Sequence, residues 1–200
     1  DYYSIEKIDW FRALYEPINL IQWFNDGSAI TVNFDKIYET LNNSKHVSIA
    51  TPFNQMLLHH FLRRDSSMES VVFKVHGDLF SRKREVILSK EEFKCAYQNE
   101  DFLNMLKKWV NQYVLLFVGI DICKDEYLQN ILDATSQEGI THFAIVGCED
   151  DSEKKRALLN EYASLHIKPI LYDINKPDSI RIILHKLLVD SKNDKWAQSF

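Results

Sequence analysis

The chain has 200 residues, of which 46% are hydrophobic and 26% charged, a composition typical of one globular domain with a sizeable core. A net charge of -5 and a pI near 5.8 argue against direct binding to nucleic acid, because phosphate neutralisation requires a cationic surface. No apolar run is long enough to span a membrane, and no signal-peptide pattern opens the chain. We therefore expect a cytoplasmic protein that contacts neither membrane nor nucleic acid.

Short apolar runs alternate along the chain with segments in which apolar residues recur at helical spacing. The predicted strands cover residues 29–32, 71–75, 114–118, 142–146 and 169–174. The predicted helices cover residues 35–41, 53–64, 91–97, 101–112, 125–134, 152–165 and 178–189. Ser89 and Glu92 have the spacing of a capping box. This alternation predicts βαβ units and therefore an α/β, Rossmann-like three-layer fold around a mainly parallel sheet.

Polar residues follow two of the predicted strands. The first strand leads into Thr31, Asn33 and Asp35, in the order Thr-Val-Asn-Phe-Asp, and the second is followed directly by His76 and Gly77. α/β proteins place nucleotide chemistry in loops at the carboxyl ends of parallel strands, so these residues are candidates for a site. The residues alone leave another interpretation open. Asn33 and Asp35 would then cap the next helix, and His76-Gly77 would be an ordinary turn.

A third loop follows the predicted strand at residues 114–118 and contains Gly119 and Asp121. Gly119 fits a strand-end turn, and Asp125 is better explained as a helix N-cap. The five glycines form no Gly-x-Gly-x-x-Gly motif, so the first glycine-rich βα unit of a dinucleotide fold is missing. Because the chain also begins at Asp1 without an initiator methionine, we expect it to be a fragment, a processed product or a trimmed form of a longer protein.

Three cysteines, Cys95, Cys123 and Cys148, lie far apart in the sequence and form no Cys-x-x-Cys motif. This pattern is typical of reduced thiols in a cytoplasmic protein, and it excludes a four-cysteine zinc site. We therefore expect no metal site and no copurifying zinc.

Taken in order, these segments resemble the sirtuin-like domain of bacterial, anti-phage NAD hydrolases. That family has a Thr-Thr-Asn-Tyr-Asp-like loop, a His-Gly pair after a strand, and a Gly-Tyr-Ser-x-x-Asp-like turn after a buried strand. The likeness covers about residues 28–190, the C-terminal two-thirds of such a domain. Its matching segments are residues 31–35, residues 73–78, residues 86–89 leading to Phe93 and Tyr97, and residues 115–119 followed by Asp125 and Leu128. The resemblance implies that residues 1–200 form a single partial sirtuin-like domain with NAD+ hydrolase activity in anti-phage defence.

The resemblance also implies roles for the candidate residues. Cleavage of the nicotinamide–ribose bond passes through an oxocarbenium-like state, which needs an oriented ribose and an activated water. Asn33 would position the ribose or the water, and His76 would be the general base, because an imidazole accepts protons near neutral pH. Asp35 would contact the nicotinamide amide or anchor its loop. The residues expected to bind NAD+ are Thr31, Asp35, Gly77, Gly119 and Asp121.

Two departures from the family pattern bear on activity. Asp121 stands where the family often has serine, and its carboxylate would either repel the pyrophosphate or bind a ribose hydroxyl. Without the glycine-rich turn, we expect the chain alone to bind NAD+ poorly until an upstream segment, a partner chain or another copy in a homo-oligomer completes the sheet.

Competing functions remain open at this point. Protein-deacetylating sirtuins carry a four-cysteine zinc module that this chain cannot build, so simple NAD+ hydrolysis is favoured over deacetylation. The alternatives are a non-catalytic nucleotide-binding or assembly module with a degenerate site, and a purely structural interaction domain.

Overall fold

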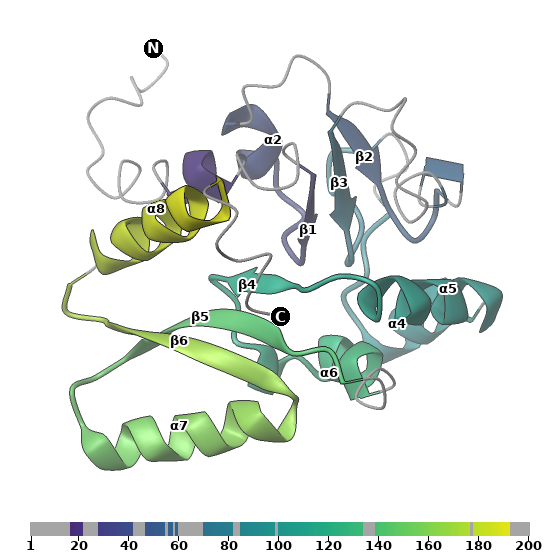
Figure 1. Ribbon diagram of the computed structural model, residues 1–200. Coiled ribbons are helices and arrows are strands. Elements are labelled where there is room, and N and C mark those ends of the chain that lie inside the picture. Colours follow the sequence, from purple (N-terminus) through teal and green to yellow (C-terminus); the bar gives the residue numbers. More distant parts are fainter. Residues whose placement is uncertain are drawn as a thin grey trace. The chain divides into compact units, whose positions relative to one another are not determined.

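The computed structural model of the protein describes residues 17–21, 28–41, 47–54, 56–57, 59, 70–81, 85–98, 100–133, 139–176 and 178–192. The chain forms two compact units, Asp1–Gln98 with Arg181–Phe200, and Asn99–Ile180. Each unit contains a three-stranded parallel sheet with helices (Figure 1). The prediction of an α/β, Rossmann-like fold with parallel strands is confirmed. The sequence predicted one sheet, and the described residues form two, because periodicity identifies strands without showing which of them pair.

The sheet of the first unit has the order β1-β3-β2 (Figure 1). Its strands are β1 (Ala29–Thr31), β2 (Ser48–Ala50) and β3 (Val71–Lys74). The central strand β3 pairs with both neighbours, and every one of its residues is buried. Strand β2 was not predicted, because Ser-Ile-Ala is too short and too polar to give a periodic signal.

Two helices of the first unit follow the loops that contain the candidate residues, one after β1 and one after β3. Helix α2 (Ile37–Leu41) follows the loop after β1, and α4 (Lys90–Ala96) follows the segment after β3. The predicted capping box of α4 is confirmed: Ser89 Oγ accepts from the Glu92 N–H at 3.2 Å, and the Glu92 carboxylate accepts from the Ser89 N–H at 2.9 Å. Backbone hydrogen bonds from Leu88 and Ser89 lower the pKa of Glu92.

The C-terminal end of α4 is tied to the segment that follows β3. The buried Tyr97 hydroxyl donates a hydrogen bond to the Val75 carbonyl oxygen at 2.8 Å, and the Tyr97 ring stacks on Phe93 with ring centroids 4.2 Å apart. A satisfied buried hydroxyl fixes the backbone that it contacts, so α4 holds the residue immediately before His76.

The sheet of the second unit has the order β4-β5-β6 (Figure 1). The strands of this sheet are β4 (Leu116–Val118), β5 (His142–Cys148) and β6 (Ile167–Asp173). The helices of the unit are α5 (Glu100–Val110), the 3-10 helix η3 (Ile122–Lys124), α6 (Glu126–Asp133) and α7 (Ser152–Ser164). Helix α7 packs along β6. Pro169, which has no N–H to donate, lies in the edge strand β6, where proline is tolerated. Helix α8 (Asp178–Lys192) leads from this unit back to the first.

Part of the sequence prediction lies outside the described residues. Of the predicted helix at 53–64, residues 56, 57 and 59 are helical and most of the remainder is not described. In the described part of the chain, no helix combines the length and the apolar character needed to cross a membrane. Cys95, Cys123 and Cys148 are free thiols.

Buried His142, at the start of β5, gives a prediction of pH-dependent stability. Its Nδ1 atom accepts a hydrogen bond from the Leu115 N–H at 3.2 Å, and burial lowers its pKa below the usual 6.5. Only the neutral imidazole can accept this bond. His142 therefore binds a proton more readily in the unfolded chain than in the folded one. Its contribution to the free energy of unfolding should be constant above about pH 6.5. That contribution should fall as the pH drops from there to the lower pKa of the folded state.

Urea unfolding between about pH 5 and pH 8 tests this expectation. The matched variant is His142→Gln, which keeps a hydrogen-bond acceptor but does not titrate. Its stability should vary less with pH than that of the wild type. An equal pH dependence in both proteins would show that another group is responsible.

Candidate functional site

Asn33 and His76 occupy equivalent positions at the carboxyl edge of the first sheet. Strands β1 and β3 are parallel neighbours in which Thr31 is the partner of Lys74, and the Val75 N–H continues the ladder by donating to the Thr31 carbonyl at 3.0 Å. Asn33 and His76 each come two residues after this last pair. The two loops therefore begin side by side at one edge of the sheet, as expected for loops that follow parallel strands.

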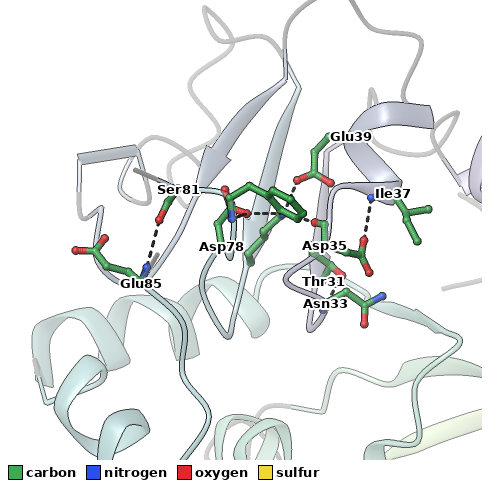
Figure 2. A network of polar contacts seen from close by, with 10 residues as sticks. Thr31, Asn33, Asp35, Ile37, Glu39, Asp78, Ser81 and Glu85 are labelled. Carbon is green, nitrogen blue, oxygen red and sulfur yellow. Dashed lines mark hydrogen bonds and ion pairs between the residues drawn. The ribbon is translucent and has the colours of Figure 1, made fainter. Parts of the chain in front are cut away.

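The loop after β1 has a fixed local geometry. Thr31 Oγ1 accepts from the Asn33 N–H at 3.1 Å, and Asp35 Oδ1 accepts from the Ile37 N–H at 2.8 Å, at the first residue of α2 (Figure 2). Asp35 thus satisfies one of the N–H groups that a helix start leaves open. The helix-cap interpretation is confirmed for Asp35. The Asn33 side chain is exposed and extends away from the dashed network in Figure 2.

The turn after β3 is held by backbone contacts on both sides. The Gly77 N–H donates to the Lys74 carbonyl at 3.1 Å, the Ile87 N–H donates to the His76 carbonyl at 2.8 Å, and Gly77 forms an antiparallel bridge with Val86. The His76 side chain is half-buried, and its Nδ1 atom is buried. Gly77 has φ +84°, which explains why glycine is needed in this turn.

A buried ion cluster around Lys74, which the sequence did not predict, contacts both of these loops. Lys74, the last residue of the central strand, has no exposed surface. Its Nζ atom lies 2.6 Å from Glu39 Oε1 and 3.2 Å from Asp78 Oδ1, and it donates a hydrogen bond to the Asp35 carbonyl (Figure 2). The oxygens of the Glu39 carboxylate are also buried, and their contact with Lys74 is an ion pair.

The sequence does contain a signal for this cluster. A lysine interrupts the run Val-Val-Phe-Lys-Val, whose apolar character on both faces predicts a buried strand. Lysine is almost never fully buried without partners, so its presence in such a strand predicts carboxylates or carbonyls around it. The identity of those partners, Glu39 and Asp78, depends on tertiary structure.

Gly119 and Asp121 follow β4 in the second unit. Gly119 is exposed with φ +69°, and a Cβ atom added there would meet no atom of the described residues within 4 Å. Asp121 is exposed, with one carboxylate oxygen 2.6 Å from Lys124 Nζ. Asp125 Oδ1 accepts from the Leu128 N–H at 3.0 Å and so caps α6, as predicted. The candidate residues that the structure brings together are those of the first unit: Thr31, Asn33, Asp35, His76 and Gly77.

Comparison with known protein families identifies the kind of domain. A family model for the SIR2-like domain matches residues 27–170, which is well over half of the chain and includes all seven candidate residues. The chain belongs to the SIR2-like family. Proteins of this family use NAD+. A search of curated proteins found no match to the chain.

Among the residues of this SIR2-like chain that the structure describes, no group of three or more His, Cys, Asp or Glu side chains is arranged to hold a metal ion. Burial raises the pKa of the Cys123 thiol to about 11, with smaller contributions from Glu161 and Asp121, so the thiol is neutral at physiological pH. That the protein needs no metal stays a prediction from its sequence.

Proposed function

We propose that this SIR2-like chain is an NAD+ glycohydrolase, which uses water to split the nicotinamide–ribose bond into nicotinamide, ADP-ribose and a proton. The observation that carries the proposal is the placement of Asn33 and His76 at register-equivalent positions beyond the paired strands β1 and β3, inside the segment matched by the family model. We further propose that both units belong to one sirtuin-like domain, since the match extends through both.

The side chains fit the chemistry of this bond cleavage. The transition state carries positive charge on the ribose, and a water must attack as nicotinamide leaves. The exposed amide of Asn33 can both donate to and accept from a ribose hydroxyl or the water. His76 can take the proton that the attacking water loses, which makes it the proposed general base.

The remaining candidates in the first unit support the loops around these two residues. One carboxylate oxygen of Asp35 is engaged by the Ile37 N–H, so only the other is available to a nicotinamide amide. The Thr31 hydroxyl is engaged by the Asn33 N–H, which makes shaping of the loop its first role. In the second unit, the open surroundings of Gly119 suit close approach of a ligand to its backbone.

A second candidate function is a non-catalytic nucleotide-binding or assembly module. Asp121 favours it, because an exposed carboxylate replaces the serine common in the family and would repel a pyrophosphate. Lys124 offsets part of that charge from 2.6 Å away. We therefore keep hydrolysis as the leading proposal. An anti-phage role in the cytoplasm and assembly with further copies or a partner chain are part of the same proposal.

Incubation of the complete protein, together with any partner that completes the sheet, with NAD+ tests the proposed activity; the chain alone is the comparison, and it should bind NAD+ more weakly. Chromatography should show equal amounts of nicotinamide and ADP-ribose, and calorimetry should show binding of a non-hydrolysable NAD+ analogue. If the active form is a homo-oligomer, activity per chain should rise with protein concentration. Binding without release of nicotinamide would favour the non-catalytic module, and the absence of both would favour a structural interaction domain.

A further inference from the structure

The ammonium group of Lys74 contacts three different segments of the first unit. It donates to the Asp35 carbonyl in the loop after β1, pairs with Glu39 in α2, and pairs with Asp78 in the turn after β3 (Figure 2). Asp35 lies two residues after Asn33, and Asp78 lies two residues after His76. A single buried charge therefore connects the two loops that bear the proposed catalytic residues.

The ammonium of Lys74 is surrounded by acceptors and carboxylates. Its Nζ atom donates hydrogen bonds to the Asp35 carbonyl and to Asp78 Oδ1, and it forms an ion pair with Glu39. Lys74 has no exposed surface, so it cannot reach a substrate. A catalytic role in contact with substrate is therefore not available to it.

The charge balance makes the three contacts mutually dependent. One ammonium stands against two carboxylates, those of Glu39 and Asp78, and the two side chains are only 14% and 9% exposed. Charges removed from water need good geometry and several partners to be tolerated, and loss of one partner leaves the others uncompensated. A shift of either loop would therefore pull an acceptor away from a charge that has no access to water.

Strand pairing alone does not fix the two loops relative to each other. The ladder between β1 and β3 ends at Thr31 and Val75, before Asn33 and His76 are reached. Beyond that point, the hydrogen bond described between the loops runs from the Leu79 N–H to the Phe34 carbonyl and is long, at 3.3 Å. The buried contacts of Lys74 are the stronger link.

We propose that Lys74 is a positioning residue, whose ammonium holds the Asn33 loop and the His76 turn at one fixed separation. The expected effect of Lys74 on NAD+ turnover rests on the proposed function, whereas its expected effect on the structure of the two loops does not. It predicts that a change in one loop is transmitted to the other through Lys74.

Asp78→Ala and Asp78→Asn provide the test, with hydrogen exchange measured by mass spectrometry on peptides covering residues 31–39 and 76–81. Alanine removes an acceptor from Lys74, and asparagine keeps one. We expect Asp78→Ala to speed exchange in residues 31–39, in the other loop, and Asp78→Asn to restore slow exchange. Glu39→Ala is the reciprocal variant, and it should speed exchange in residues 76–81. Asp150→Ala, which removes the exposed ion pair with Lys155, is the matched control and should change neither peptide.

Turnover of NAD+ supplies the second measurement. Because small misplacements of catalytic groups cost up to about 100-fold in rate, Asp78→Ala should lower kcat by about 10-fold to 100-fold, with KM changed far less. Asp78→Asn should recover most of kcat. A purely structural role would lower the melting temperature without this split between kcat and KM.

The outcomes separate the two proposals. Absence of nicotinamide release by the wild type would overturn the proposed function, and the exchange measurement would still test Lys74. Unchanged exchange in residues 31–39 of Asp78→Ala, together with unchanged exchange in residues 76–81 of Glu39→Ala, would overturn the positioning role. If Asp78→Ala does not fold, the comparison of Glu39→Ala with Glu39→Gln decides, since glutamine keeps an acceptor for Lys74.

Discussion

His76→Ala is expected to lower the rate of NAD+ hydrolysis by about 100-fold to 10,000-fold, the factor that a positioned general base contributes to catalysis. Asn33→Ala should abolish nicotinamide release to a similar extent, because the ribose or the attacking water loses its orienting amide. Asn33 is exposed and His76 half-buried, both in loops at strand ends. Polar residues in such positions contribute little to core packing, so we expect melting temperatures close to that of the wild type.

Two matched variants control for general effects of these substitutions. His185→Ala removes an exposed histidine from α8, and Asn104→Ala removes an exposed asparagine from α5. Both should keep wild-type turnover. Nicotinamide release at the wild-type rate in folded His76→Ala or Asn33→Ala would remove that residue from the catalytic assignment. Loss of activity accompanied by a large drop in melting temperature would assign it a structural role instead.

The sequence predicted the backbone of this site well, for a simple physical reason. Strands that alternate with helices are almost always parallel, and parallel strands end on the same edge of their sheet. Asn33 and His76 could therefore be assigned to one edge without knowledge of the tertiary structure. The pairing of Thr31 with Lys74 then places them at equivalent positions.

Local capping could also be read from spacing. The box formed by Ser89 and Glu92 and the cap provided by Asp125 involve residues three apart in the sequence, and both are present in the structure. Such contacts form within one helical turn, so they need no tertiary information.

The Lys74 cluster as a whole could not be predicted, because two of its members, Asp35 and Glu39, lie far from Lys74 in the chain, although Asp78 lies only four residues after it. Glu39 is 35 residues before Lys74, and nothing in the local pattern around Glu39 distinguishes it from a solvated residue of a short helix. Only the lysine itself was conspicuous, as a charge within an apolar strand. An argument from burial would have predicted carboxylate partners for it but not identified them.

Gly77→Ala is expected to lower the free energy of unfolding by about 3 kcal/mol or more, because two independent costs combine at this position. Gly77 has φ +84°, a conformation that strains any residue with a Cβ. A Cβ atom added there would also lie 2.1 Å from the Glu85 carbonyl oxygen and 3.1 Å from Val86 Cα. Both contacts are backbone atoms, which cannot rotate out of the way as a side chain does.

Relief of this clash would disturb the contacts that hold His76. The Asp78 N–H donates to the same Glu85 carbonyl at 3.0 Å, and the Ile87 N–H donates to the His76 carbonyl at 2.8 Å. Separation of the two segments would break both hydrogen bonds and shift Asp78, a partner of Lys74. We therefore expect Gly77→Ala to lose NAD+ turnover as well as stability.

Gly119→Ala is the matched control, since it separates backbone strain from steric clash. Gly119 also has positive φ, at +69°, but an added Cβ would meet no atom of the described residues within 4 Å. It should therefore lose only about 1–2 kcal/mol, the cost of the left-handed conformation alone. Urea unfolding of the two variants beside the wild type gives the comparison. An equal decrease in the free energy of unfolding of the two variants would contradict this expectation. It would show that the turn after β3 can move to accept a methyl group, so that the close approach of Glu85 does not hold His76 in place.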